Sequence, residues 1–302
     1  MHIMVTGSSG FVGTRLVPLL LDKGYEVTGI ARHPSNISGN HPLFNFIEAD
    51  GTQPGQWQEA VKSVDAVINL AGVNIFRRWS ARSKKLIYDS RILTTRNLVE
   101  ALPDGKPVVF CSTSAVGFYG FRDDEPLDES ATAGDDFLAR LSVDWEHEAR
   151  QAEKKGARVV LDRFGIILGK NAGALASMLP AFRMFVGGRL GSGKQWFPWI
   201  HLDDLAAAHL FVIQNPEVSG PVNFTAPHPV RNREFAQTLG KVLRRPSFFK
   251  VPGFVLRLAA GELGEVLLNG QRVIPQKLQD QGFVFQYPQI EDALRASTKE
   301  TH

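Results

Sequence analysis

Short apolar runs alternate with longer amphipathic runs through the first two-thirds of the chain. Ile3–Val5 is apolar, Val12–Lys23 repeats apolar residues at helical spacing, and Glu26–Ala31 is apolar again. Later runs of strand length lie at 43–49, 64–70, 108–111 and 158–163, and later helical patterns lie at 80–102 and 136–154. Strands that alternate with helices are typical of a parallel sheet with helices on both faces. We therefore expect an α/β fold with a doubly wound parallel sheet.

The pattern changes at about Gly169. Glycines interrupt residues 187–193, and an aromatic run, Trp196–His201, is expected to form one strand. Further elements are expected at 205–214 (helix), 222–225 (strand), 231–243 (helix) and 246–302 (short helices mixed with extended pieces). We expect residues 1–168 to form mainly the sheet domain and residues 169–302 mainly a smaller α+β substrate lobe. The chain has no long linker, so we expect it to cross between two closely packed lobes.

The turn between the first strand and the first helix carries glycines at a spacing of three, in Thr6–Gly13. Such a turn can cradle a dinucleotide: Gly7 permits the tight turn, Gly10 lets the backbone approach the pyrophosphate, and Gly13 lets the helix pack closely on the strand. The helix N-terminus adds free amides and a partial positive charge. A tight turn in another kind of α/β protein is the alternative. The strand before it and the helix after it favour a Rossmann-type nucleotide site.

Two charged residues at strand ends bear on the kind of nucleotide. Arg32 ends the second strand, where an acidic residue would bind the ribose 2′-hydroxyl of NAD and a cation suits the 2′-phosphate of NADP. A solvated strand-end arginine is the alternative, and we expect NADP rather than NAD. Asp50 ends the third strand, where its carboxylate can accept a hydrogen bond from the adenine amino group, or be an ordinary loop acid.

Composition excludes several classes of protein. The 302 residues are 43% hydrophobic and 22% charged with a net charge of +3, which gives no electrostatic argument for a nucleic-acid partner. A single cysteine, Cys111, excludes an internal disulfide and a cysteine-based zinc site, and we expect it to be a buried apolar filler. His201 and Asp203 lack further ligands at metal-binding spacing. The first strand begins within three residues of Met1 and no apolar run approaches the length of a membrane span, so we expect a cytoplasmic protein without a membrane partner.

Several longer stretches together resemble a known family. They are Thr6–Gly13, Asn69–Gly72, Ser112–Gly120, Gly191–His201 and Asn269–Pro275. Over nearly its whole length the chain resembles the extended short-chain dehydrogenases/reductases of the NAD(P)-dependent epimerase/dehydratase type. Within that group it is similar to the atypical "epimerase family" proteins, sometimes labelled nucleoside-diphosphate-sugar epimerases, which carry their own C-terminal segment.

The resemblance implies the positions that would contact a cofactor and a substrate. To the positions that the resemblance implies for the cofactor we add Ser9 of the turn and Arg91. The expected cofactor-binding residues are then Gly7, Ser9, Gly10, Phe11, Val12, Arg32, Asp50, Leu70, Ala71, Gly72, Arg91, Ser112, Arg163, Phe164 and Gly165. Ser114 falls where family enzymes keep a hydroxyl that hydrogen-bonds the substrate oxygen, which makes it the expected catalytic residue. A local backbone cap is the alternative for a serine after a strand.

The chain departs from the family where active members carry a Tyr-x-x-x-Lys pair on the next helix. In those members the lysine lowers the tyrosine pKa so that the tyrosine can exchange a proton with the substrate. Aligned on Glu146, the two positions hold Leu138 and Ser142, and a one-residue slip gives Phe137 and Leu141. Neither register contains a proton-transfer group, so we expect the usual acid/base pair to be missing.

Four further features near the expected pocket are Arg91, Arg140, Tyr119 and the aromatic run that begins at Trp196. Arg91 replaces an asparagine of the family; it either steadies an anionic substrate or an oxyanion, or is a helix-surface or ion-paired arginine. Arg140, the cation nearest to the missing pair, reads as a surface residue. Tyr119 either supplies the missing hydroxyl or packs, with Phe118, under the second lobe. Trp196 and its aromatic neighbours suit either a stacking site for a flat substrate or the core.

Two functions follow. The first is an NADP-dependent oxidoreductase or epimerase, in which Ser114 positions the reacting oxygen and water or an unusual side chain handles the proton. Its substrate would be a small molecule, a nucleotide sugar or another carbonyl compound. The second is a catalytically inactive NADP-binding sensor or scaffold. Family members also suggest a homodimer through the helices at 80–102 and 136–154.

Overall fold

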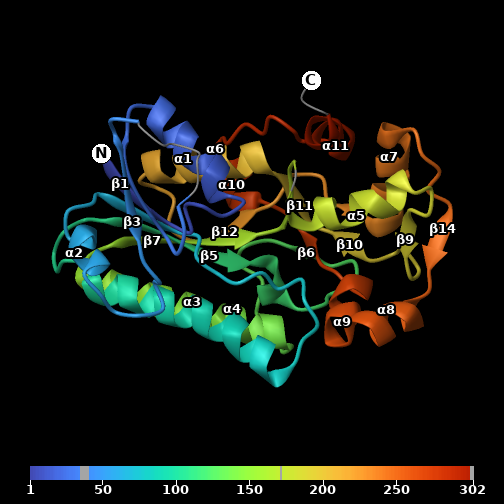
Figure 1. The fold of residues 1–302 in the computed structure, drawn as a ribbon, viewed down its shortest axis with the longest axis horizontal. Helices are drawn as coiled ribbons and strands as arrows, with labels where there is room; N and C mark the ends of the chain where they lie inside the picture. Colours follow the sequence, from blue (N-terminus) through green and yellow to red (C-terminus); the bar gives the residue numbers. More distant parts are fainter. Residues whose placement is uncertain (35–40, 171, 300–302) are drawn as a thin grey trace.

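A seven-stranded parallel sheet forms the centre of the computed structural model, which describes residues 1–34, 41–170 and 172–299. Its strands, in spatial order, are β12 (Gly220–Phe224), β7 (Arg158–Phe164), β5 (Val109–Ala115), β4 (Ala66–Asn69), β1 (His2–Thr6), β2 (Glu26–Ala31) and β3 (Phe44–Glu48). Every neighbouring pair in this sheet is parallel (Figure 1). The order runs outwards in both directions from β1, which confirms the Rossmann-type, doubly wound sheet predicted from the sequence.

Helices cover both faces of this sheet (Figure 1). α1 (Gly13–Asp22) and α6 (Leu202–Gln214) pack on one face, and α2 (Trp57–Val61), α3 (Ala81–Ala101) and α4 (Phe137–Arg150) pack on the other. Successive residues of β1 point to opposite faces, as the strand period requires: Ile3 and Val5 join the core under α1, and Met4 joins the core under α3. Burial on both faces explains the continuous apolar runs of these strands.

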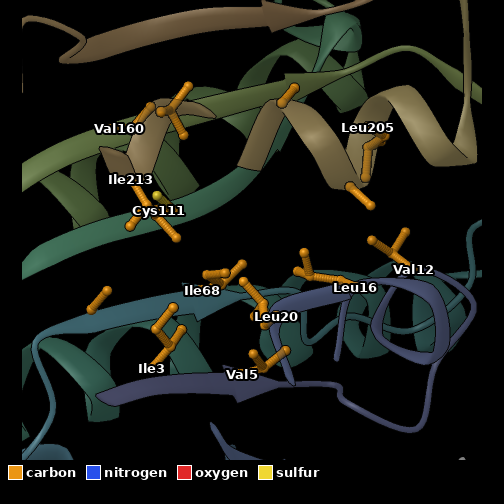
Figure 2. Packing of buried hydrophobic residues seen from close by; sticks show 14 of the residues in the cluster. Ile3, Val5, Val12, Leu16, Leu20, Ile68, Cys111, Val160, Leu205 and Ile213 are labelled. Atoms are coloured by element: carbon orange, nitrogen blue, oxygen red, sulfur yellow. The ribbon is translucent and has the colours of Figure 1, made fainter. Parts of the chain in front are cut away.

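The core between the sheet and the α1–α6 layer is shown in Figure 2. Leu16 and Leu20 of α1 and Leu205 of α6 pack here against apolar residues of the sheet, and all three are fully buried. Cys111 lies in this cluster as a buried free thiol, as predicted. Burial raises the pKa of that thiol well above its usual value, so it is held as the neutral, apolar form.

In the described part of the chain, four two-stranded sheets and five helices lie outside the central layers, and a further helix, α10 (Gln276–Asp280), packs on β12 of the central sheet. The strand pairs are β8 (Ile166–Leu168) with β11 (Trp199–His201), β9 (Gly188–Leu190) with β14 (Phe249–Val251), β10 (Trp196–Phe197) with β13 (Val230–Arg231), and β6 (Pro126–Leu127) with β15 (Arg272–Val273). The five helices are α5 (Gly173–Arg183), α7 (Asn232–Leu243), α8 (Gly253–Ala260), α9 (Glu262–Leu268) and α11 (Ile290–Thr298). The 3₁₀ turns η1 (Val116–Tyr119) and η2 (Gln151–Lys155) follow β5 and α4.

The single strand predicted over Trp196–His201 is wrong. The run divides at Pro198 into β10, which pairs antiparallel with β13, and β11, which pairs parallel with β8. Pro198 has no amide hydrogen to donate to a strand partner, so the chain changes partners there. The aromatic residues Phe197 and Trp199 are buried in a second core, where Phe197 stacks on Phe235 with 4.3 Å between the ring centroids. These rings are core residues and do not form a stacking site.

The chain passes from the central sheet to the smaller lobe and back. α6 and β12 lie beyond residue 168 yet belong to the central layers, whereas β6 lies before it and pairs with β15 of the C-terminal segment. The division at residue 168 stays a prediction, and residues 300–302 of the expected second lobe lie outside the described residues. Among the helices that the structure describes, none combines the length and apolar character needed to cross a membrane.

Candidate cofactor and active site

The residues predicted for the cofactor fall at one edge of the central sheet, because the carboxyl ends of parallel strands meet at the same edge. They are Gly7, Ser9, Gly10, Phe11 and Val12 after β1, Arg32 after β2, Asp50 after β3, Leu70, Ala71 and Gly72 after β4, Ser112 on β5, and Arg163, Phe164 and Gly165 at the end of β7. Arg91 reaches this edge from α3.

The glycines of the turn between β1 and α1 are required by its geometry. Gly7 has a φ of 65°, and a Cβ there would lie 3.1 Å from the carbonyl of Leu70. A Cβ on Gly13 would lie 2.5 Å from the carbonyl oxygens of Gly7 and Ser8, which is far inside van der Waals contact. The amide of Gly10 donates to the carbonyl of Gly7 at 2.9 Å and closes the turn. The roles predicted for Gly7 and Gly13 therefore agree with the backbone geometry.

The same turn leaves three amides free. Within the described residues, the backbone N–H groups of Phe11, Val12 and Gly13 donate no hydrogen bond. The hydroxyl of Thr14 donates to the carbonyl of Phe11 at 3.0 Å, which holds the backbone of the turn in place. Free amides at a helix N-terminus carry partial positive charge and bind anions. The residues present therefore fit a dinucleotide diphosphate.

Arg32 and Asp50 lie where the adenosine end of a dinucleotide would extend from this turn. Arg32 follows β2 and is exposed, and β2 lies next to β1 in the sheet. Asp50 is also exposed, and its Oδ1 accepts hydrogen bonds from the amide and the hydroxyl of Thr52 at 3.0 and 2.8 Å. Those bonds form an ordinary Asx turn, which leaves the second carboxylate oxygen for another donor.

At the carboxyl end of β5, Ser114 belongs to a buried polar network. Its Oγ donates to Oε1 of Glu146 at 2.8 Å. The guanidinium of Arg163 donates Nε–H to the same oxygen at 2.7 Å and Nη2–H to Oε2 at 2.8 Å. Nη1 of Arg163 donates to the Tyr119 hydroxyl at 3.0 Å, and that hydroxyl donates to Oδ1 of Asn223 at 2.7 Å. We call these five residues the buried network; each is buried.

The network settles the two readings of Tyr119. The side chain is fully buried, and desolvation raises its pKa to about 12 against the opposing effect of Arg163. Its hydroxyl is hydrogen-bonded to Arg163 and Asn223, so it is not free to bind a substrate. The guanidinium of Arg163 also lies 3.5 Å from the centroid of the Phe118 ring. The packing interpretation of the Phe118–Tyr119 pair is therefore the one that the structure supports.

The network contains two residues that sequence reasoning did not assign to the site. Glu146 served there only as an alignment anchor, and Asn223 was read as part of a short strand. A polar residue inside the apolar strand at 222–225 was the available signal for Asn223. The contact of Arg163 with the cofactor stays a prediction. Its guanidinium pairs with Glu146, because a buried cation is stable only with a partner.

α4 carries the two positions where active relatives keep tyrosine and lysine. Asp136 caps the helix, and its Oδ1 accepts from the amides of Leu138 and Ala139 at 2.8 and 3.0 Å. Leu138 packs against Gly117, where a Cβ on the glycine would be 3.1 Å from the leucine Cβ, and Ser142 is buried. Arg140 is exposed and donates to a backbone carbonyl, as expected of a surface residue.

Arg91 projects from α3 toward the segment after β4. Its Nη1 donates to the carbonyls of Val73 and Ile87 at 3.1 and 3.0 Å, and the guanidinium lies 5.2 Å from the ring centroid of Trp145. Desolvation lowers its pKa to about 10, so it stays charged at neutral pH. No carboxylate of the described residues pairs with it, so the ion-pair reading is wrong.

Three more predicted positions complete the edge. Ser112 is buried, with a hydroxyl that has no partner among the described residues. Phe164 packs on Phe224 with ring centroids 5.7 Å apart. A Cβ on Gly165 would lie 2.8 Å from the carbonyl oxygen of Pro198, so only glycine fits there.

In the part of the chain that the structure describes, no cluster of three or more histidine, cysteine or acidic residues could hold a metal ion.

Comparison with known proteins agrees with this geometry. Residues 3–224 match the model of the NAD dependent epimerase/dehydratase family. The chain belongs to this family. A domain of unknown function, DUF1731, matches residues 251–297, which is the family-specific C-terminal segment expected from the sequence.

Related epimerase/dehydratase family proteins match over almost the whole chain. A chloroplastic homolog of epimerase family protein SDR39U1 from Arabidopsis thaliana is 42% identical over 98% of this chain and 86% of its own length. Epimerase family protein Mb2239 from Mycobacterium bovis is 42% identical over 98% of this chain and 97% of its own. Among solved structures, human epimerase family protein SDR39U1 with NADPH is 35% identical, with a TM-score of 0.87 over 98% of this chain and 99% of that chain.

Proposed function

We propose that this protein binds NADP(H) across the edge of its central sheet and acts as an oxidoreductase or epimerase on a small carbonyl compound or nucleotide sugar. The glycine turn, with its three free amides, carries this proposal. An exposed cation at the end of the neighbouring strand, Arg32, supports NADP rather than NAD. The 35% identical human relative, solved with NADPH, adds support.

Each part of the cofactor would meet a different part of this edge. The amides of Phe11, Val12 and Gly13 would hold the diphosphate, and Arg32 the 2′-phosphate. The free carboxylate oxygen of Asp50 would accept from the adenine amino group. The segment 70–72 would line the adenosine side, since Gly7 approaches the Leu70 carbonyl closely.

Bound NADP(H) supplies hydride exchange at the nicotinamide ring. The protein must then position the reacting oxygen and handle a proton. Ser114 lies at the end of β5 for the first task, but its hydroxyl hydrogen is directed to Glu146 at 2.8 Å. The Ser114 oxygen can accept a hydrogen bond in this arrangement, and it can donate to a substrate oxygen only after rotating away from Glu146. With Leu138 and Ser142 at the usual acid/base positions, the proton would pass to water.

Fluorescence titration with NADPH and NADH tests the cofactor assignment. The wild type should bind NADPH more tightly than NADH. Replacing Arg32 by Asp should weaken NADPH by about 10-fold to 100-fold, the value of one or two charge-assisted hydrogen bonds. NADH affinity should change little. Arg140→Asp, an equal charge change on the surface of α4, is the control. Equal wild-type affinities for both nucleotides would show that the 2′-phosphate assignment is wrong.

A catalytically inactive sensor or scaffold is the second candidate function. The observation that favours it is the engagement of both candidate hydroxyls, Ser114 with Glu146 and Tyr119 with Arg163 and Asn223. A panel of carbonyl compounds added to the NADPH-loaded protein separates the two functions. Loss of NADPH fluorescence with time supports a reductase. Conversion of a nucleotide sugar to its epimer by the NADP⁺-loaded protein, followed by chromatography because no cofactor is consumed, supports an epimerase. Stable binding without conversion of any compound in either assay supports the sensor.

The homodimer and the cytoplasmic location stay predictions. α3 and α4 pack against each other and expose apolar side chains, Leu86 at 45% and Val143 at 39%. These two helices are the expected contact surface. Light scattering after gel filtration, on the wild type and on a variant with Val143→Glu, would test it: a dimer that the substitution converts to monomer supports this surface.

A further inference from the structure

Arg91 is a partly buried cation whose charge no side chain of the described residues neutralises. Its guanidinium is held by two backbone carbonyls and by the face of Trp145. Elsewhere in the site, the buried Arg163 is matched by the carboxylate of Glu146. A partly buried cation without a matching carboxylate, at the edge of the sheet where ligands bind, is a candidate anion-binding group. Arg91 therefore differs from the structural arginine of the buried network.

The contacts of Arg91 engage one end of the guanidinium and leave the other free. Both hydrogen bonds come from Nη1. Among the described residues, Nε and Nη2 donate no hydrogen bond, and neither is a fully buried unpaired atom, so both are open to solvent. These two atoms carry parallel N–H bonds along one edge of the guanidinium, which is the arrangement that binds a carboxylate or a phosphate through two hydrogen bonds. The anchored Nη1 keeps this edge oriented before any ligand arrives, which lowers the entropy lost on binding.

Gly72 keeps this edge accessible. A Cβ on Gly72 would lie 3.2 Å from Cζ and 3.3 Å from Nη2 of Arg91, so any larger residue would crowd the free edge. Gly72 is exposed and follows β4, so it lies at the carboxyl edge of the sheet where ligands bind in this fold. Ser90, the preceding residue of α3, accepts a hydrogen bond from the amide of Val73 at 3.1 Å. The helix thus fixes the segment that borders the guanidinium.

We propose that the Nε–Nη2 edge of Arg91 binds an oxyanion of the substrate, so that the substrate is a carbonyl compound bearing a carboxylate or a phosphate group. This rests on the proposed function, because it takes the carboxyl edge of the sheet as the substrate site. The cofactor diphosphate has its own donors in the free amides of the glycine turn after β1. Arg91 instead stacks on Trp145 of α4, the helix that packs on β5 beside Ser114. Its anion is therefore assigned to the substrate.

Two pairs of probes test the proposal without requiring turnover. Benzoylformate is compared with its uncharged methyl ester, and dihydroxyacetone phosphate with dihydroxyacetone. Each is titrated by calorimetry into protein saturated with NADP⁺, with which a ketone forms a dead-end complex. The wild type should bind the charged member of one pair about 10-fold to 100-fold more tightly than the neutral member. A preference within the benzoylformate pair indicates that Arg91 binds a carboxylate, and a preference within the dihydroxyacetone pair indicates that it binds a phosphate group.

Variants of α3 test whether Arg91 causes the preference for the charged probe. Arg91→Gln should abolish the preference, Arg91→Lys should keep part of it, and Arg82→Gln, an exposed arginine of the same helix, should leave it intact. NADP⁺ affinity should stay within about two-fold throughout, since the diphosphate donors are unchanged. No preference in the wild type, or a preference that survives in Arg91→Gln, overturns the proposal.

The same titrations separate this proposal from the proposed function. If Arg91→Gln weakens NADP⁺ binding and leaves the probe preference unchanged, the anion belongs to the cofactor and the proposal is wrong. If the wild type does not bind NADP⁺, the proposed function fails. The probe pairs are then titrated into the protein alone, where a preference lost in Arg91→Gln would still support an anion site at Arg91.

Discussion

Replacing Glu146 by Gln should destabilise the protein strongly, because it removes the negative charge at the centre of the buried network. The carboxylate accepts from Ser114 and makes two hydrogen bonds to Arg163, and the side chains of the ion pair are 3% (arginine) and 6% (glutamate) exposed. Without the charge, the Arg163 cation stays buried and unpaired. Breaking a buried pair by neutralising one partner costs about 3–5 kcal/mol.

That loss is a large share of the total stability of a typical protein, about 5–15 kcal/mol. For a chain of this size, about 2 °C of melting temperature is lost per kcal/mol, so we expect a fall of about 6–10 °C. Glu148→Gln is the matched control on the same helix. Glu148 pairs with Arg96 at the surface, with side chains that are 19% and 47% exposed, and such a pair contributes about 0–1 kcal/mol.

Thermal denaturation at one pH and one salt concentration measures both variants. A second arm replaces both partners with apolar residues, Glu146→Leu with Arg163→Met, and should recover part of the lost stability because no unpaired charge remains. If Glu146→Gln melts no lower than Glu148→Gln, the buried pair does not hold these elements together, and the reasoning is refuted.

Three further predictions follow. Gly13→Ala should abolish NADPH binding and lower the melting temperature, because the alanine Cβ would lie 2.5 Å from the Gly7 carbonyl oxygen. Gly24→Ala is the control: Gly24 has a φ of 79° and open space around it, so the substitution should lower the free energy of unfolding by about 1 kcal/mol and leave NADPH binding unchanged. Tyr119→Phe should cost about 1–3 kcal/mol in urea denaturation, since it leaves buried partners of the hydroxyl unpaired. Burial lowers the pKa of His209 to about 4, below the unfolded value of 6.5. The contribution of the neutral imidazole to folding stability is therefore fully present above pH 6.5 and is lost as the pH falls toward 4, because the unfolded chain takes up a proton first. Over this pH range, the melting temperature of His209→Gln should fall less than that of the wild type.

Elements that arise from local patterns of residues could be predicted from the sequence. The β1–turn–α1 unit follows from an apolar run, glycines at a spacing of three and a helical repeat, so its place and its glycine geometry were predictable. Alternating strand and helix patterns also predicted the parallel sheet, and a parallel sheet places every strand end at one edge. Arg32 and Asp50 were therefore assigned to the same edge as the turn before any contact was known.

Contacts between side chains of distant elements depend on how those elements pack in the fold. The buried network joins Ser114, Tyr119, Glu146, Arg163 and Asn223 from β5, η1, α4, β7 and β12, residues up to 109 positions apart in the chain. Strand order and register create those contacts, and neither is a property of any local pattern.

The same limit explains the corrections. The sequence could not show that strand partners change at Pro198, or that no carboxylate of the described residues pairs with Arg91. Local periodicity shows which residues are buried, but the partner of a buried charge depends on how distant elements pack. For this protein, the glycine turn that would bind the cofactor could therefore be predicted from a short stretch of sequence. The buried network and the surroundings of Arg91 could be described only from the folded structure.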